Sequence, residues 1–515
     1  MKQVYIQCCL LIMGFHLDAQ NFIRAYSNLP FSDTPGLVLP EDCIQMPDGR
    51  FVITGYTGYI LETDAFGNPL STHSLFSGIN PLSDAINYSC ISVAGNNQVF
   101  LGGSLSPDSV FFAKIDLSSG PEWLRGYDLS GNNIKAMATT ADGSLIALAT
   151  SSRGASQSAI PVITKINSQG NLIWQKRYFN SDPAAGRMRW ESMSLASNGD
   201  ILIAGVSADP SPFEAQFVRL NQDGEQVWTK SIEAANNNNE EAIGLFETFD
   251  GTLRFAIGSP LPGVQLATGS INGDGTLINA SSWSGFSSAP NSSAVFADGK
   301  TAVVFDNNSE VLFCDSDDNL LFSNAYNFPG LGTLIFDKAI RGIDNNLALF
   351  GGYSVSFFGD FVIALFTLPL TGETAPGFST SISTDSQPFN PVFVNRNITD
   401  STGSAIYNLN LSYAEIELMY DTLFANNPLH FERTENKSPF MVYPNPASNE
   451  ISISYSCSDC LFELYDLKGQ LIKSFIINTD DSSFDVTAVL PGTYFLCLRN
   501  HTEIIESRRV LILPK

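Results

Sequence analysis

A short phrase that recurs along the chain constrains its fold more than any other feature. Residues 169–179 read QGNLIWQKRYF, and residues 223–232 read DGEQVWTKSI with a tryptophan in the matching place. Turn dipeptides also recur at steps of 46 to 56 residues, each between two apolar segments. Self-similarity at this period indicates a repeat architecture. The dipeptides are Asp48-Gly49, Asn96-Asn97, Asp142-Gly143, Asn198-Gly199, Asp250-Gly251, Asp298-Gly299 and Asp344-Asn345.

Each repeat unit has the turns of a four-stranded antiparallel sheet. Asp-Gly and Asn-Gly supply the positive φ angles of a two-residue hairpin turn, and an apolar strand such as SLIALAT or DILIAGV follows. Helical periodicity is almost absent. A second turn is expected between the third strand and the fourth of each unit. It is marked by Gly67, Gly120, Gly170, Gly224, Gly275, Asn319 and Gly372.

A sheet of four short strands cannot bury both of its faces alone, and radial stacking around an axis is the usual solution. The sequence therefore predicts an all-β chain with a seven-bladed β-propeller over residues 20–375. Trp123, Trp174 and Trp228 recur on the final strands of their units, where we expect them to pack against a neighbouring blade. Stacking against a sugar is the alternative interpretation of these three side chains.

Closure of the ring has two candidate strands. NFIRAYSN, residues 21–28, resembles the outer strand IWQKRYFN and is expected to complete the last blade. The alternative fourth strand of that blade is GFSTSIST, residues 377–384. Units three and four resemble the degenerate repeats of bacterial secreted propellers. That resemblance implies a scaffold for binding or assembly and no particular reaction.

The N-terminus has the features of a secretory signal. Lys2 precedes an apolar stretch that runs to Phe15, and a small residue, Ala19, ends the segment. We predict a signal peptide over residues 1–19; a short buried strand is the alternative. Beyond it the longest apolar run is residues 361–370, which is shorter than the roughly 20 residues of a membrane-spanning helix. No transmembrane segment is expected in the mature chain.

The repeat ends near residue 375, and the composition changes. Residues 376–439 are rich in Ser, Thr, Pro and Asn, which predicts a linker with short strands. Residues 440–515 alternate apolar strands with a Lys-Gly turn and a Pro-Gly turn. This pattern predicts a small antiparallel β-sandwich, similar to an immunoglobulin-like domain.

The last domain resembles the type A C-terminal sorting domain of the type IX secretion system of Gram-negative bacteria. The resemblance implies a secreted or cell-surface protein, with the translocon and a sortase as partners. It also implies removal of the domain near RTENKSP, residues 433–439. The matching positions form the sorting motif, which is Tyr443, Pro444, Asn445, Pro446, Tyr465, Asp466, Gly469, Pro491, Gly492, Tyr494 and Lys515.

The charge balance limits the classes of partner and cofactor. A net charge of -25 excludes an electrostatic nucleic-acid binder. The densest set of oxygen ligands is the DSDDN segment with Asp315, Asp317, Asp318 and Asn319. It lacks the glycine and the distant glutamate of an EF-hand loop, so a plain acidic turn is favoured and calcium is the alternative. No other cofactor is expected.

Cysteine and histidine offer no assembled site. After signal removal Cys43, Cys90, Cys314, Cys457, Cys460 and Cys497 remain, too few for a disulfide-built scaffold. Only Cys457 and Cys460 are close in sequence, as a turn disulfide or as two free thiols. A zinc site would need a second pair of ligands with suitable spacing. His73, His430 and His501 are scattered and predict neither a catalytic triad nor a metal centre.

Two functional hypotheses follow. The favoured one is a secreted or cell-surface, non-catalytic propeller that binds a glycan, protein or matrix component. The alternative is an extracellular enzyme that degrades a polysaccharide or peptide with carboxylates at the propeller mouth. Glu191, Glu240 and Glu241 are the least routine acids, because they are expected just before the first strand of a blade. Solvated loop charge is the simpler account of each.

Overall fold

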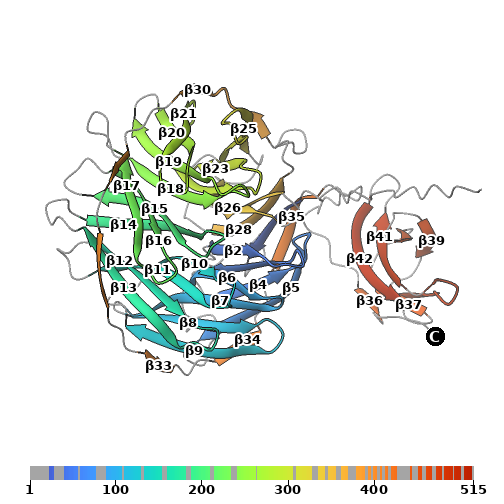
Figure 1. Cartoon of the computed structure of the whole chain (residues 1–515). Helices are drawn as coiled ribbons and strands as arrows, with labels where there is room; N and C mark the ends of the chain where they lie inside the picture. The colour runs from blue at the N-terminus through green and yellow to red at the C-terminus, as the bar shows by residue number, and fades with distance from the viewer. Residues whose placement is uncertain are drawn as a thin grey trace, which may run out of the picture. The chain divides into compact units, whose positions relative to one another are not determined.

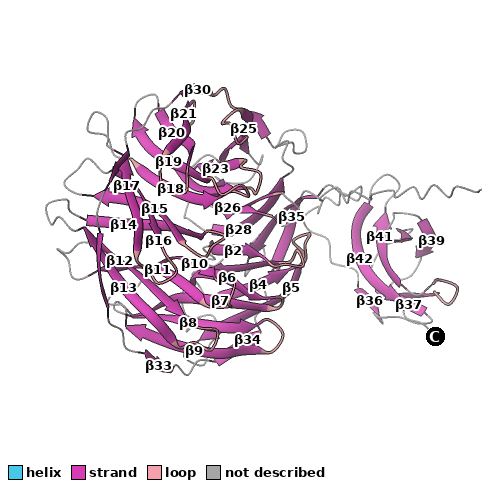
Figure 2. Cartoon of the chain, in the orientation of Figure 1, coloured by secondary structure: helices cyan, strands magenta, loops and turns pink. Residues whose placement is uncertain are grey.

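The computed structural model divides the chain into one unit of Met1–Phe424 and a second of Ala425–Lys515. Every regular element among the described residues is a β-strand (Figure 2), and none of these residues lies in a helix able to cross a membrane. The predicted signal peptide lies outside the described residues. The structure describes residues 22–27, 40–55, 58–76, 88–106, 109–128, 133–152, 159–180, 187–208, 214–232, 240–261, 264–305, 309–326, 334–342, 346–354, 361–368, 379–388, 393–395, 398–402, 406–408, 412–415, 419–425, 441–443, 450–454, 460–466, 471–477, 481–490, 492–499 and 504–512.

The first unit is a ring of sheets. Seven five-stranded antiparallel sheets are present among the described residues (Figure 1). The first strand of each sheet contacts the first strand of the next, and the last of them contacts the first, which closes the ring. The fold is a β-propeller, and this arrangement is consistent with the seven repeat units. The sheets are called blades 1 to 7 in the order of their first strands.

Four strands of every blade follow the predicted meander from the channel outward. The first strands are β2 (Pro40–Gln45), β6 (Tyr88–Gly95), β10 (Asn133–Thr139), β14 (Arg187–Leu195), β18 (Glu241–Glu247), β22 (Pro290–Val295) and β26 (Leu334–Arg341). The second strands are β3 (Phe51–Gly55), β7 (Gln98–Ser106), β11 (Leu145–Ser152), β15 (Ile201–Ala208), β19 (Leu253–Leu261), β23 (Thr301–Phe305) and β27 (Leu347–Ser354). The third strands are β4 (Tyr59–Thr63), β8 (Ser109–Asp116), β12 (Ala159–Ile166), β16 (Glu214–Leu220), β20 (Val264–Ile271), β24 (Glu310–Cys314) and β28 (Phe361–Leu368). The fourth strands are β5 (Pro69–Phe76), β9 (Gly120–Asp128), β13 (Leu172–Asn180), β17 (Gln226–Ile232), β21 (Leu277–Ser284), β25 (Leu320–Tyr326) and β1 (Phe22–Ser27).

The N-terminal strand closes the propeller. β1 pairs antiparallel with β28, with Ala25 opposite Ala364, and so supplies the fourth strand of blade 7. This confirms the predicted clasp. The alternative segment contributes β29 (Ser379–Ser381), which pairs with β25 of blade 6. The last blade thus joins the start of the repeat region to its end.

A belt of seven short strands forms the outermost layer of the propeller. It occupies residues 379–425, inside the stretch described above as a linker, and each strand extends one blade at its outer edge. Along the chain the belt visits blades 6, 5, 4, 3, 2, 1 and 7, opposite to the order in which the blades are built. Figure 1 shows the labelled β30, β33 and β34 at the periphery. The belt strands are β29, β30 (Asp385–Pro388), β31 (Phe393–Asn395), β32 (Ile398–Thr402), β33 (Ile406–Asn408), β34 (Ser412–Glu415) and β35 (Met419–Ala425).

The first turn of most blades differs from the predicted two-residue type. In blade 1, Met46 N donates to Arg50 O at 2.7 Å and Gly49 N donates to Met46 O at 2.9 Å, which makes a three-residue loop. Only the glycine has a positive φ, +93°. The Asp48 carboxylate accepts the Arg50 amide at 3.2 Å, and this favours a type I turn followed by a left-handed glycine. The same bonds recur around Gly143, Gly199, Gly251 and Gly299.

Two of the predicted turns need separate mention. Asn96 and Asn97 do form a two-residue turn, between paired Gly95 and Gln98. In the second turn of blade 6 the left-handed position belongs to Asp318, with φ +61°, and not to the predicted Asn319. The Asp344-Asn345 turn and Gly372 lie outside the described residues.

The repeated tryptophan packs against the second turn of the next blade. Trp123 of blade 2 donates its indole N–H to Ser168 O at 2.9 Å, and Trp228 of blade 4 donates to Gly273 O at 2.8 Å. A Cβ atom at Gly170, in the turn beside Trp123, would lie 2.8 Å from Cδ2 of that ring. The turn glycine is therefore required twice, by its φ of +77° and by the indole that covers it.

The hydrophobic core lies between neighbouring blades. One cluster joins Ile146 and Leu148 of blade 3 to Trp190 and Ile203 of blade 4. Another joins Phe51 of blade 1 to Phe350 of blade 7, so the closing junction is packed like the others. Each blade buries both faces only because it has neighbours on both sides.

The second unit is a sandwich of two antiparallel sheets, as predicted. Ile451 of one sheet packs in the same buried cluster as Phe462, Leu496 and Val510 of the other. The three-stranded sheet has β36 (Met441–Tyr443), β37 (Glu450–Ser454) and β40 (Asp481–Asp485). The four-stranded sheet has β39 (Leu471–Ile477), β38 (Cys460–Asp466), β41 (Gly492–Arg499) and β42 (Ile504–Ile512).

We predict that Gly170→Ala destabilises the propeller more than Gly251→Ala does. Both glycines have positive φ, so each substitution carries a backbone cost of about 1–2 kcal/mol. A Cβ at Gly251 would meet nothing within 4 Å, whereas one at Gly170 would meet Trp123, which adds about 1–3 kcal/mol of overpacking. Urea unfolding measures the difference. Equal losses in the two variants would mean that the indole contact is unimportant.

Candidate functional site

The same irregularity in all seven first strands shapes the channel of the propeller. At one equivalent position in each strand a residue has no partner on the second strand, so a β-bulge stands there in every blade. None of the seven is buried, whereas the preceding residue in blade 4, Trp190, is fully buried. A bulge re-aims a side chain. The bulge residues are Glu41, Ser89, Lys135, Glu191, Ile243, Asn291 and Asp337.

These residues line a central cavity of about 1080 Å³. Residues from all seven first strands line it, and every bulge residue is among them. Six of the seven bulge side chains are polar, and only Ile243 is apolar. The cavity is therefore a water-accessible polar site at the upper end of the size range of small-ligand pockets.

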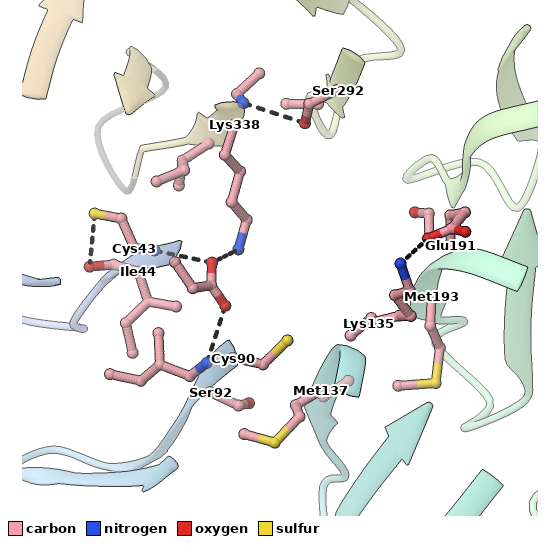
Figure 3. A pocket seen from close by; sticks show the side chains of 18 of the residues that line it. Cys43, Ile44, Cys90, Ser92, Lys135, Met137, Glu191, Met193, Ser292 and Lys338 are labelled. Carbon is pink, nitrogen blue, oxygen red and sulfur yellow. Dashed lines mark hydrogen bonds and ion pairs between the residues drawn. The ribbon is translucent and has the colours of Figure 1, made fainter. Parts of the chain in front are cut away.

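One sector of the channel, on blades 7 and 1, gathers carboxylates. Asp42 accepts hydrogen bonds from the backbone amides of Cys43 at 2.8 Å and Ile91 at 2.9 Å, and it forms an ion pair with Lys338 (Figure 3). Two bulge residues are next to this pair in the sequence: Glu41 directly precedes Asp42, and Asp337 directly precedes Lys338. Burial by the surrounding protein, together with the charges of Asp337 and Asp42, raises the pKa of Glu41 to about 7. Glu41 thus changes its charge near neutral pH.

A second sector, on blades 3 to 5, is a chain of alternating charges. Lys135 Nζ lies 2.7 Å from Glu191 Oε2 (Figure 3), and Arg189 Nε lies 3.1 Å from Glu191 Oε1. Arg189 Nη2 also donates to both carboxylate oxygens of Glu241 at 3.1 Å. Burial raises the pKa of Glu241, and the Arg189 charge opposes that shift. The carboxylates in this sector are compensated by fixed cations.

The three candidate acids of the sequence separate in the structure. Glu191 was expected before a first strand, but it lies within β14. It is the extra residue of the bulge there, and it lines the channel. Glu241 begins β18 and lines the channel. Glu240 precedes β18 and is only 3% exposed; burial and the nearby Glu214 raise its pKa to about 7. Two of the three acids therefore belong to the channel.

Sequence reasoning missed Glu41 and Asp337. A bulge does leave a trace, because two buried residues are then separated by three positions instead of two. In blade 4 the buried residues are Met188, Trp190 and Met193. That break in alternation was the available signal in this blade.

The structure brings two parts of the sorting motif together. Asp466 at the end of β38 pairs with Tyr494 on β41, and Tyr465 pairs with Phe495. The Tyr494 hydroxyl donates to Leu490 O at 2.7 Å, which ties the segment before β41 to this strand. Tyr443 ends β36 and Gly492 begins β41. The remaining motif residues, Pro444, Asn445, Pro446, Gly469, Pro491 and Lys515, lie outside the described residues.

The acidic DSDDN segment is organised by its own hydrogen bonds. The Asp315 carboxylate accepts the amides of Asp317 at 2.9 Å and Asn319 at 2.8 Å. Asp318 forms a buried ion pair with Arg254 of blade 5 at 2.5 Å. Across the described part of the chain, no three acidic, cysteine or histidine side chains come together as a metal site. Calcium binding by this segment was the less favoured interpretation, and it stays untested.

Two of the described cysteines, Cys43 and Cys90, lie at the channel wall beside Asp42, and the other described cysteines and His73 lie elsewhere. Cys43, Cys90 and Cys314 are buried free thiols, and Cys497 is buried on β41. His73 is half-buried on β5. Cys460 begins β38. The proposed Cys457–Cys460 pair is untested, because Cys457 lies outside the described residues, as do His430 and His501.

The comparison with protein families identifies the second unit. Residues 441–512 match the secretion system C-terminal sorting domain. The C-terminal unit is a sorting domain of this family. The sorting domain marks the chain as a protein exported by type IX secretion and placed at the cell surface or in the medium of a Gram-negative bacterium. The comparison with curated proteins found no match to this sequence.

Solved structures similar to the chain share little sequence with it. BamB from Moraxella catarrhalis is 11% identical, with 64% of this chain and 96% of that chain covered and a TM-score of 0.37. YCF48 bound to D1 peptide is 11% identical, covering 67% and 97%, with a TM-score of 0.37. The gluconolactonase XC5397 from Xanthomonas campestris is 16% identical, covering 53% and 91%, with a TM-score of 0.31. The propeller assignment comes from the ring of sheets itself.

We predict that the change in stability caused by Glu41→Gln is more favourable at pH 8 than at pH 5. The folded state raises the Glu41 pKa from 4.5 to about 7, so between these values it binds the proton more strongly than the unfolded chain does. The free energy of unfolding therefore falls as the pH rises through this window. Glutamine removes the dependence, which thermal melts at both pH values would show.

The control is Glu225→Gln, on an exposed turn of blade 4. Its effect on the melting temperature should be the same at both pH values. An equal effect of Glu41→Gln at pH 5 and pH 8 would contradict the shifted pKa.

Proposed function

We propose that the protein is a non-catalytic, secreted or cell-surface propeller that binds a glycan, protein or matrix component in its central channel. The supporting observation is the ring of β-bulges, which presents one unburied side chain from every blade to a single cavity. A bulge at an equivalent position in all seven blades is a feature of the repeat. The seven positions carry six different residue types, as expected of a site adapted to one ligand.

The charges of the channel favour binding over catalysis. Glu191 is held by both Lys135 and Arg189, and Asp42 is held by Lys338 and two backbone amides. Carboxylates compensated in this way are hydrogen-bond acceptors at fixed positions. They suit the recognition of hydroxyl or amine groups on a ligand.

Glu41 and Asp337 give the channel its polarity. Burial raises the pKa of Glu41 to about 7, and the negative charge of Asp337 adds to that shift, so the two carboxylates repel each other when both are charged. A ligand amine or a set of hydroxyl donors placed between them would relieve that repulsion. We infer that the positive or hydroxyl-rich part of the ligand approaches blades 7 and 1.

The double variant Glu41→Gln, Asp337→Asn should weaken binding of the channel ligand at least about tenfold, because two charge-assisted hydrogen bonds are lost. Calorimetric titration with extracellular polysaccharides and peptides measures the change. The matched control is Glu225→Gln with Asp223→Asn, two exposed turn residues outside the channel. Equal affinity of the double variant and the control would contradict channel binding.

A second candidate function has one observation in its favour. A glutamate with a pKa near 7 beside another carboxylate is the arrangement of a general acid in a polysaccharide-degrading enzyme. The same substrates distinguish the two functions. Turnover by the full chain that Glu41→Gln abolishes, while binding persists, would establish the enzyme and displace the non-catalytic proposal.

The sorting-motif residues are proposed to be read by the type IX translocon, and the segment before them to be cut by the sortase. Asp466 and Tyr494 are paired on adjacent strands, and Tyr494 is buried in the sandwich core, so it would hold the strand end at Asp466 in place. Deletion of residues 441–512 should leave the propeller in the periplasm of a host with this system. When the full sequence is expressed, mass spectrometry of the exported protein should find a C-terminus near Lys437. Export of the deleted chain at the normal level would contradict the proposal.

A further inference from the structure

A second cavity lies between blades 5 and 6. Its volume is about 350 Å³, and it shares no lining residue with the channel. The first turn of blade 5, the first turn of blade 6 and the strands β20 and β21 all contribute to its walls. A cavity of this size is at the lower end of the roughly 300–1,000 Å³ typical of ligand pockets. It would hold one ring of a larger ligand.

The strand register explains why this junction is hollow. On the third and fourth strands of blade 3, Lys165 is opposite Trp174, and in blade 4 Arg219 is opposite Trp228. The corresponding pair in blade 5 is Ser270 and Asn279, both of which line the cavity. Two of the largest side chains of the repeat are replaced by two small polar ones, and the vacated space is the cavity.

Arg254 takes over the structural work of the missing tryptophan. In blades 2 and 4 the indole N–H binds a carbonyl in the next blade's second turn, two residues before the left-handed position. The equivalent carbonyl in blade 6 belongs to Ser316, and it accepts Arg254 Nη1 at 3.1 Å. Arg254 also bonds Ser270 Oγ at 2.9 Å and pairs with Asp318, and it is 1% exposed. The junction is therefore stable while the indole position stays open.

The walls combine hydrogen-bonding groups with an apolar surface. The buried Asn279 Oδ1 has no hydrogen-bond partner among the described residues. A carboxamide turns readily about its last side-chain bond, so it can offer either an acceptor or donors to a ligand. Phe249 is 94% exposed and Ile278 is 51% exposed at the same cavity. An exposed aromatic ring beside an unsatisfied amide fits a ligand with one apolar face and several hydroxyl groups.

We propose that this cavity binds a saccharide ring. The C–H face of the ring would lie on Phe249, and its hydroxyl groups would bond Asn279 and the hydroxyl of Ser270. Hydroxyls act as donors and acceptors together, which matches a carboxamide and a serine. The wall also carries the carboxylates of Asp250, Asp298 and Asp317, which can accept hydrogen bonds from ring hydroxyl groups. The proposal does not depend on the channel function, since the two cavities are separate.

The test uses the full chain and a panel of neutral monosaccharides, amino sugars and short oligosaccharides. Saturation-transfer NMR finds the binders, and calorimetry measures their affinity. Asn279→Trp restores the residue of blades 2 to 4 and fills the cavity, whereas Phe249→Ala removes the exposed ring. We expect both variants to weaken saccharide binding at least about tenfold.

Two controls keep the experiment decisive. Ile173→Ala changes an exposed aliphatic residue at the blade 3 position that corresponds to Ile278, and it should bind like the parent. Phe249→Ala alters only an exposed side chain, so it tests the site even if Asn279→Trp disturbs folding. Failure of every saccharide to bind, or binding that Phe249→Ala leaves unchanged, would overturn the proposal. So would displacement of the saccharide by a simple alkylammonium compound that binds the cavity more tightly.

Discussion

The contact of an indole ring in one blade with a glycine turn in the next holds the repeat together. Trp123 lies over Gly170 and donates to Ser168 O, so its blade is joined to the following one by packing and by a hydrogen bond. The turn must adopt a left-handed conformation there, and no side chain can occupy the space of the indole. Tryptophan and glycine are therefore one device, although they lie about fifty residues apart. This explains why the tryptophans and the second-turn glycines recur with the same period in blades 2 to 5.

Much of the architecture could be predicted because it depends on local chemistry. Turn dipeptides and alternating strands gave the blades, and the likeness of residues 21–28 to an outer strand gave the clasp that β1 forms. The belt could not be found in this way, because strands of three to seven residues pair through their backbones at exposed edges and need no apolar pattern. The bulges add one residue to each first strand and so alter register without altering composition. The left-handed turn residue Asp318 was also missed, because glycine or asparagine is the residue expected at such a position.

Both candidate sites arise where the repeat departs from itself. The channel takes its character from bulge positions where blades 1 and 7 carry Glu41 and Asp337 and blade 3 carries Lys135. The second cavity exists because blade 5 replaces a cation and a tryptophan by Ser270 and Asn279. In a repeat fold the common residues build the scaffold, and the exceptional ones are free to specify function. The buried Arg254–Asp318 pair shows the compensation that such an exception requires.

The belt determines how the propeller would respond to a force applied at its C-terminal end. The strand nearest that end is β35 on blade 7, and the strands before it lie on blades 1, 2, 3, 4, 5 and 6 in turn. A pulling force on the chain beyond residue 425 would therefore act on one short strand at a time, and the belt strands would separate from the blades in sequence. The four inner strands of each blade would carry load only through the belt strand that pairs with the fourth of them. Under such a force the short belt strands would unpair before the inner strands of the blades do.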